Sequence, residues 1–260
     1  MTITLSKARD RAGVLSPVTL DLPAGTYGVV GPNAAGKTTL LELLHRAGLP
    51  DSAFARASAD ATFAGYTVAD HLACAQDARE HFNQDLFHAV LGDVDPTTGL
   101  QKLSVGQRRR LTLASAIAAG TGALLLDEPF DGLDAATRAH LREHLIDALT
   151  GPVRILVLTS HRAEDLAGLV DQIIAVHDHS VTGPVTLDET RTVFPTLEGP
   201  TGSVAAAVTG RTVLSHERLG GHARATVHGS APADAADLEV RYPTDAELID
   251  LLATHAPTRS

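Results

Sequence analysis

A glycine-rich loop is the first part of this sequence whose residue types could do chemistry. Residues 31–38, GPNAAGKT, match the pattern G-x-x-x-x-G-K-[ST] and lie between the apolar run TYGVVG and the helix-like segment KTTLLELLHRAG. In such a strand–loop–helix, backbone N–H groups and the helix N-terminus hold phosphate oxygens. A plain turn before a helix is the alternative, and the order of the elements argues against it. The residues expected to contact nucleotide are Gly31, Asn33, Ala34, Ala35, Gly36, Lys37, Thr38 and Thr39.

Two side chains of this loop and an acidic pair further along the chain suit phosphoryl chemistry. Lys37 is placed to reach the β- and γ-phosphates, and the Thr38 hydroxyl is placed to bind Mg²⁺. Asp127 and Glu128 follow the apolar run ALLL, which is typical of a strand buried on both faces. At that strand end Asp127 could hold Mg²⁺, and Glu128 could polarise an attacking water. Acidic residues that merely solvate a strand end are the alternative, which the phosphate loop argues against.

Ala34 and Ala35 fill a stretch of the loop that could have held glycine. An alanine is strained at positive φ, because its Cβ approaches the backbone carbonyl oxygen. We therefore expect the backbone at Ala34 to avoid positive φ.

The stretch KLSVGQRRRLTLASA, residues 102–116, reads as a helix start with an unusual first turn. Ser104 and Gln107 have the spacing of a capping box. Gly106 costs up to about 1 kcal/mol relative to alanine, and three arginines follow near the positive end of the helix dipole. Bare backbone donors and cations at this place predict that an anion docks there. For the arginines themselves we favour a solvated helix face over a direct role.

The composition fits a soluble globular protein. The chain has 260 residues, of which 44% are apolar, and no apolar run approaches the length of about eighteen residues that a membrane helix needs. The first residues lack the apolar segment of a secretory signal, and Cys74 is the single cysteine, so we expect a reducing, cytoplasmic setting. The net charge of −10 and the 3% aromatic content argue against a nucleic-acid binder.

The order of the predicted elements indicates an α/β fold with a mostly parallel sheet. Alternating apolar residues predict two edge-type strands in the first 22 residues. Buried strands alternate with helices through residue 180, which favours a parallel sheet flanked by helices. Beyond Gly183 the chain is rich in Gly, Pro and Ala, and a capping box of Thr244 and Glu247 predicts a last helix. We expect a main domain at 1–180, with a helical subdomain at about 67–120, and an α+β extension at 181–260.

Five elements in a fixed order resemble the nucleotide-binding subunit of an ATP-binding cassette (ABC) transporter. They are GPNAAGKTT, LSVGQ, LLLDEP, DGLD and a histidine at the end of an apolar strand, and they span residues 1 to about 180. The resemblance implies a P-loop NTPase fold, with ATP and Mg²⁺ as ligands. It also implies a head-to-tail dimer, in which Ser104, Gly106 and Gln107 of one copy contact the γ-phosphate of ATP held by the other.

The same resemblance assigns roles to residues near the γ-phosphate. His161 matches the histidine that contacts this phosphate and orients the attacking water. Asp131 and Asp134 of DGLD are expected at the dimer interface, although DGLD alone is simply a good turn. The expected catalytic residues are Glu128, His161 and Lys37, and the expected metal ligands are Thr38 and Asp127.

The resemblance also implies partners. A chain with one cassette needs a second cassette and membrane-spanning transporter subunits, which would hold it on the inner face of the cytoplasmic membrane. The segment YPTDAELIDLL is similar to the tail of ABC-2-type exporter ATPases, which favours export. A non-hydrolysing nucleotide-binding regulator is the alternative. A soluble ABC ATPase acting on DNA or ribosomes is disfavoured, because the sequence shows no coiled-coil insertion, second cassette or basic surface.

Several positions depart from the family's pattern. The family has a glutamine that binds Mg²⁺ and senses the membrane partner, yet none occurs here between Thr39 and Gln76, where small residues lie near Ser58. Ala8 stands where the family has an aromatic that stacks on adenine, and Val105 stands where it most often has glycine. Because the catalytic carboxylate and the strand-end histidine remain, we still expect hydrolysis.

Overall fold

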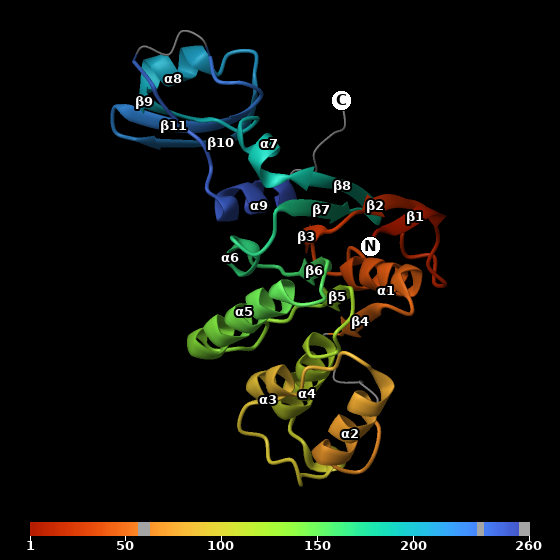
Figure 1. Ribbon diagram of the computed structural model, residues 1–260. Helices are drawn as coiled ribbons and strands as arrows, with labels where there is room; N and C mark the ends of the chain where they lie inside the picture. Colours follow the sequence, from red (N-terminus) through yellow and green to blue (C-terminus); the bar gives the residue numbers. More distant parts are fainter. Residues whose placement is uncertain (57–62, 233–236, 255–260) are drawn as a thin grey trace.

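A six-stranded sheet forms the centre of the molecule (Figure 1). The computed structural model of the chain describes residues 1–56, 63–232 and 237–254. Five neighbouring strands of the sheet run parallel, and the sixth pairs antiparallel with the fifth. In spatial order they are β4 (Ser52–Ala55), β5 (Ala123–Leu126), β6 (Ile155–Thr159), β3 (Gly25–Val30), β7 (Gln172–His177) and β8 (Ser180–Thr186).

One face of the sheet is covered by helix α1 (Lys37–Gly48) and by a two-stranded ribbon of β1 (Ile3–Ala8) and β2 (Val18–Leu22). The ribbon is antiparallel, as the alternating apolar residues predicted. Four leucines of α1 pack with inward-facing residues of the ribbon and with every second residue of the strands, such as Leu125 and Val157. The phosphate loop thus leads from β3 into a helix that is anchored along its length.

The opposite face of the sheet carries four helices. Strand residues such as Leu124 and Leu126 pack against α4, α5, α6 and α9 in one large apolar cluster. Because side chains alternate along a strand, the same strands serve both clusters. These helices are α4 (Val105–Ile117), α5 (Ala135–Thr150), α6 (Ala163–Leu166) and α9 (Asp245–Thr254).

A small helical unit lies at one end of the molecule, shown in yellow at the bottom of Figure 1. It consists of α2 (Val68–Ala78), α3 (Gln84–Leu91), the short 3₁₀ turn Leu100–Lys102 and α4. Thr67 and Asp70 form the capping box that starts α2, as predicted. Helix α4 belongs to both regions, because Leu111 packs inside the helical unit while Leu113 packs against the sheet.

The residues after β8 form a separate four-stranded antiparallel sheet, shown in blue at the top of Figure 1. Its strands, in spatial order, are β10 (Thr212–Leu219), β11 (His222–His228), β9 (Thr196–Pro200) and β12 (Glu239–Arg241). Helix α8 (Thr201–Ala207) packs against β9 and β11. Helix α7 (Leu187–Arg191) connects this unit to β8. The chain then returns to the main sheet as α9.

The fold class is confirmed, since a mostly parallel sheet carries antiparallel N-terminal strands on one face. The division of the chain at residue 180 stays a prediction, and β8 and α9, which lie beyond it, both pack with the main sheet. The short helices α7 and α8 lie where no helix was predicted. No helix in the described ranges combines the length and the apolar character needed to cross a membrane.

Candidate nucleotide-binding site

The phosphate loop has the backbone that its glycines predict. Gly31 has a φ of 143°, and a Cβ at this position would lie 2.1 Å from the carbonyl oxygen of Val176 in β7. Gly36, at the N-cap of α1, has a φ of 109°. The Lys37 ammonium donates to the carbonyl oxygens of Gly31 (2.8 Å) and Pro32 (3.1 Å), and the residue is buried. These bonds fold the lysine back over its own loop.

The backbone at Ala34 corrects one expectation. Its φ is 63°, in the left-handed region, where alanine is strained. Ala35 has no positive φ and is buried against the leucines of the α1 side. The loop therefore requires a left-handed residue at position 34, even though the sequence places a Cβ there.

The two expected metal ligands lie side by side. The Thr38 hydroxyl donates to Asp127 Oδ2 at 2.7 Å, and the Thr159 hydroxyl donates to Asp127 Oδ1 at 2.7 Å. Asp127 is buried directly after β5, and Thr159 ends the neighbouring strand β6. A hydroxyl and a carboxylate are hard oxygen donors, so the pair fits a small divalent cation that takes its remaining ligands from phosphate and water.

Glu128 and His161 also come together. Glu128 has a φ of 47°, and its N–H donates to the Thr159 hydroxyl at 2.7 Å. Its Oε2 lies 3.0 Å from His161 Nδ1 and 3.3 Å from the His161 backbone nitrogen. Because a carboxylate accepts, Nδ1 carries the hydrogen. Side-chain exposure is 18% for Glu128 and 48% for His161, so solvent reaches both.

Thr159 links these parts, since its single hydroxyl contacts both acidic residues. No motif marks it in the sequence. The only signal is its place at the end of an apolar strand, directly before Ser160 and His161. The ends of β3, β5 and β6 therefore bring Thr38, Asp127, Glu128 and His161 into one cluster, as the sheet order predicts.

The turn formed by residues 104–107, hereafter the Ser104 turn, stands apart from this cluster. Ser104 and Gln107 form the predicted capping box, each side chain accepting from the other's backbone N–H. Ser104, Val105 and Gly106 are exposed, Val105 at 73%. A Cβ on Gly106 would meet nothing within 4 Å. Within the described ranges, no hydrogen bond joins this turn to the phosphate loop.

The arginines after the Ser104 turn do not form a solvated face, which corrects that expectation. Arg108 donates to the carbonyl oxygen of Leu100 at 3.0 Å, and Arg110 pairs with Asp93 at 2.7 Å. Arg109 reaches the carbonyl oxygen of Glu128. Each guanidinium thus has a partner inside the chain, and of these the Arg110–Asp93 pair lies at the surface.

The DGLD turn is well ordered. Asp134 caps α5 by accepting from the N–H of Thr137 at 2.9 Å, and these hydrogen bonds lower the pKa of the Asp134 carboxyl. Asp131 is 56% exposed and lies 3.7 Å from Arg109. Ala8 lies at the end of β1, and Ser58 lies outside the described residues.

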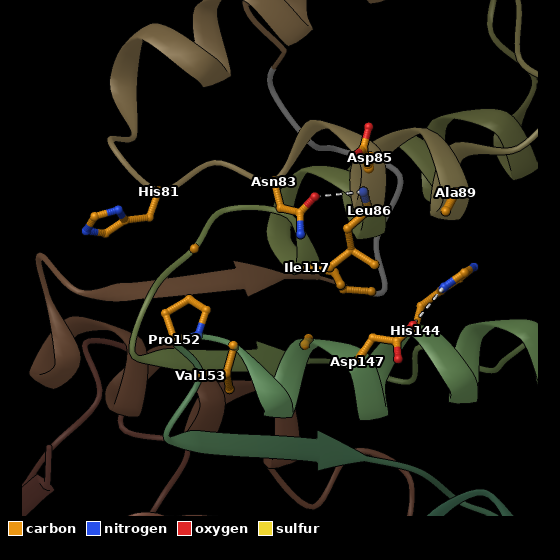
Figure 2. A pocket seen from close by; sticks show the side chains of 13 residues that line it. His81, Asn83, Asp85, Leu86, Ala89, Ile117, His144, Asp147, Pro152 and Val153 are labelled. Atoms are coloured by element: carbon orange, nitrogen blue, oxygen red, sulfur yellow. Dashed lines mark hydrogen bonds and ion pairs between the residues drawn. The ribbon is translucent and has the colours of Figure 1, made fainter.

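A hollow of about 660 Å³ lies elsewhere, between α3 and α5. Figure 2 shows side chains that line it, among them the apolar Leu86, Ile117 and Val153 and the polar Asp85, His144 and Asp147. None of the residues of the phosphate loop or of the acidic pair lines it. The predicted site at the strand ends is thus separate from this hollow.

Comparison with known proteins gives a consistent family. No family model matches the chain. The ABC transporter ATP-binding protein YtrB of Bacillus subtilis is 29% identical over 213 residues, or 71% of each chain. The aliphatic sulfonates import ATP-binding protein SsuB 1 of Paracoccus denitrificans is 32% identical over 205 residues, which cover 69% of this chain and 82% of that protein. The sulfate/thiosulfate import ATP-binding protein CysA 1 of Agrobacterium fabrum is 30% identical over 227 residues, 75% of this chain and 65% of its own.

Solved structures agree on the fold. The ATP-binding subunit of an ABC transporter superposes with a TM-score of 0.60 at 21% identity, covering 73% of this chain and 90% of that one. A bacterial Atm1-family ABC exporter with ATP bound superposes with a TM-score of 0.56 at 18% identity, covering 73% of this chain and 40% of that one. With the sequence identities above and the ordered motifs at the strand ends, the chain belongs to the ATP-binding subunits of ABC transporters.

Proposed function

We propose that this chain binds ATP with Mg²⁺ at the phosphate loop and hydrolyses it to drive a membrane-spanning transporter subunit. ATP-binding subunits of ABC transporters are ATPases coupled to transport. The observation that carries the proposal here is the Thr159 hydroxyl, which donates to the Asp127 carboxylate and accepts from the backbone N–H of Glu128. It thereby links the residue expected to hold Mg²⁺ to the residue expected to polarise the attacking water.

Binding rests on the loop. Backbone N–H groups at the N-terminus of α1 hold the phosphates, and Lys37 leaves the carbonyls of Gly31 and Pro32 to reach the β- and γ-oxygens. The Thr38 hydroxyl and Asp127 would hold Mg²⁺, the first directly and the second through its shell. When bound, the cation neutralises charge on the phosphate oxygens.

Hydrolysis rests on Glu128 and His161. Among the described contacts only Oε2 of Glu128 is engaged, which leaves Oε1 to accept a proton from the attacking water. His161 donates from Nδ1 to the carboxylate and thereby orients it. Thr159 holds the Glu128 backbone so that the carboxylate stays at the strand mouth.

Removing the base tests this assignment. We expect Glu128→Gln to lower phosphate release by about 10²–10⁴-fold, because a positioned general base contributes that much. ATP binding should stay within a few-fold of the wild type, since the amide has the same shape. Steady-state phosphate release and titration with a fluorescent ATP analogue measure the two effects.

Glu143→Gln, at an exposed position on α5, is the matched control and should retain full turnover. A wild-type chain that binds ATP without releasing phosphate would overturn hydrolysis and favour the non-hydrolysing regulator.

The proposed assembly is a head-to-tail dimer. The Ser104 turn offers exposed backbone donors and a glycine that its own chain does not require, because a Cβ on Gly106 meets nothing within 4 Å. The N-terminus of α4 favours an anion there. Such a turn suits the γ-phosphate of nucleotide held by a second cassette, with Ser104, Gly106 and Gln107 as the contacting residues and Asp131 and Asp134 near the interface.

Gly106→Ala tests the dimer. Alanine favours the helix, so we expect the free energy of unfolding to rise by up to about 1 kcal/mol, while ATP-induced dimerisation of the Glu128→Gln chain is lost. Light scattering with and without ATP measures the second effect. Gly202→Ala in α8 is the matched control, because a Cβ there also meets nothing. Dimerisation that survives in Gly106→Ala contradicts the assembly.

The family supports a proposal for the partner and the location. We place the chain on the inner face of the cytoplasmic membrane, held by a membrane-spanning subunit, with no role for nucleic acid. Export remains the direction proposed from the segment YPTDAELIDLL, although two of the relatives above are named for import. Affinity purification from detergent-solubilised membranes, followed by identification of the spanning subunit, tests the partner.

A further inference from the structure

Arg109 makes a connection that its neighbours in α4 do not make. Arg108 donates to Leu100 and lies over the Phe63 ring, and Arg110 pairs with Asp93. Those partners all belong to the helical unit. Arg109, with a side chain only 20% exposed, instead crosses to the main sheet, where it donates to the carbonyl oxygen of Glu128 and lies 3.7 Å from Asp131.

The backbone that Arg109 holds is strained and is fixed from both ends. Glu128 has a φ of 47°, a conformation that residues with a Cβ rarely adopt. Its N–H is bound by the Thr159 hydroxyl at 2.7 Å. Its carbonyl oxygen accepts from the N–H of Asp131 at 3.1 Å and from Arg109. The position of the carboxylate therefore depends on a residue of another element, one that lies on the same helix as the Ser104 turn.

Helix α4 is a stiff link between these two points. It is continuous from Val105 to Ile117, and its N-terminus is closed by the Ser104–Gln107 capping box. A push or pull on the Ser104 turn thus moves Arg109, which lies little more than one helical turn away. A small shift of the guanidinium changes both its hydrogen bond to Glu128 and its ion pair with Asp131.

We propose that Arg109 is a positioning residue that couples the two nucleotide sites of the dimer. This inference rests on the proposed function. When the γ-phosphate of the opposite site holds the Ser104 turn, α4 seats Arg109 on the Glu128 carbonyl and on Asp131. Glu128 then stays in its left-handed conformation with the carboxylate at the strand mouth. When the γ-phosphate is gone, the guanidinium is free to shift, and the carboxylate loses its orientation. Hydrolysis at one site is thereby conditional on ATP at the other.

The decisive measurement needs no turnover. In the Glu128→Gln chain, whose position 128 retains its backbone carbonyl, we expect ATP to slow amide hydrogen exchange across residues 127–134 by at least tenfold. Adding Arg109→Met should abolish this slowing while ATP binding and the melting temperature without nucleotide change little. Arg110→Met, which removes a guanidinium of the same helix that does not reach the sheet, should leave the slowing intact.

Kinetics in the chain that retains Glu128 provide the second arm. Arg109→Met should lower kcat at least tenfold with KM for ATP within twofold, and the Hill coefficient for ATP should fall toward 1. Arg109→Lys should recover part of kcat, because lysine keeps the charge but has no planar fork. Arg110→Met should keep the wild-type Hill coefficient.

The inference and the proposed function fail in different ways. If Arg109→Met slows turnover only in proportion to a lower melting temperature, with the exchange protection and Hill coefficient unchanged, Arg109 is a structural tie and the coupling is wrong. If the wild-type chain binds ATP but releases no phosphate, hydrolysis is wrong, while the exchange measurement still decides the coupling. If Arg109→Met does not fold, Arg109→Lys carries the same comparison, and unaltered protection and cooperativity in it overturn the proposal.

Discussion

Two single residues have a left-handed backbone at the ends of the parallel strands, Ala34 in the phosphate loop and Glu128 after β5. The strain at Glu128 is matched by three hydrogen bonds to its backbone. Ala34 lies in a loop whose turn bond, from the N–H of Ala35 to the carbonyl of Pro32, is 3.3 Å long. A substitution at the exposed Ala34 can therefore relieve its backbone strain. At Glu128 the strained conformation is held by its hydrogen bonds.

Ala34→Gly should therefore stabilise the chain. Relief of left-handed alanine gains about 1–2 kcal/mol, and the greater freedom of glycine in the unfolded chain takes back about 0.4–1 kcal/mol. We expect the free energy of unfolding to rise by about 1 kcal/mol in urea denaturation monitored by circular dichroism.

Ala35→Gly is the opposite case and serves as the control. Ala35 has no positive φ and its methyl group packs in the α1 cluster, so glycine there should lower the free energy of unfolding. Equal signs for the two substitutions would show that the conformation at position 34 is not left-handed in solution.

At the scale of elements, α2 and α4 are joined by a histidine with a defined tautomer. The His71 ring accepts at Nδ1 from the N–H of Ala64 at 3.2 Å. Its Nε2 lies 3.0 Å from the Ser115 hydroxyl, which itself donates to the carbonyl of Leu111 at 2.7 Å. Nε2 therefore carries the hydrogen, and the ring is neutral. Protonation of Nδ1 would break the bond to Ala64.

This arrangement predicts a pH dependence. Burial lowers the pKa of His71 below its ordinary value of 6.5. The unfolded chain thus takes up the proton first as the pH falls, so stability is full above about pH 6.5 and declines through the range below it. We expect His71→Gln to flatten that decline when urea midpoints are measured between pH 7.5 and pH 5.

His81→Gln, at an exposed position, is the control and should leave the decline as it is in the wild type. A decline of the same steepness in His71→Gln would mean that other groups, such as His45, whose pKa burial also lowers, account for it.

Elements marked by a local sequence pattern could be predicted from the sequence. Contacts between elements could be predicted less well. The capping boxes at Thr67 and Ser104 each depend on four consecutive residues, and both form. The hydroxyl of Thr159 acts on residues 31 and 32 positions away, which no periodicity reports. The arginines of α4 were misread for the same reason, because their partners Asp93 and Glu128 lie in other elements. The φ at Ala34 follows from the loop as a whole and not from the residue.

At the scale of the whole molecule, α9 belongs to the core of the nucleotide-binding region. Leu248, Ile249 and Leu252 are fully buried in the cluster that also holds residues of β5, β6 and β7. Arg191 of α7 pairs with Asp245 at the start of α9 and so fixes the angle of its return. The four-stranded sheet is thus inserted between two parts of one core.

Leu252→Ala should destabilise the whole chain, including its ATP site. Truncating a fully buried leucine costs about 2–5 kcal/mol. We expect one cooperative unfolding transition at a lower urea midpoint, with loss of ATP binding at the same denaturant concentration.

Leu219→Ala, in β10 of the four-stranded sheet and 88% exposed, should change the free energy of unfolding by less than about 0.5 kcal/mol. If Leu252→Ala lost structure only in the four-stranded sheet and still bound ATP, this result would contradict a core shared by α9 and the main sheet.

The return of α9 has a consequence for biogenesis. A nascent chain emerges from the ribosome N-terminus first, so the phosphate loop and the strands around it appear long before Leu252 does. During that interval the side of the sheet that α9 covers has no complete partner and exposes apolar surface. The strands around the phosphate loop therefore complete this side of their core only after α9 has left the ribosome.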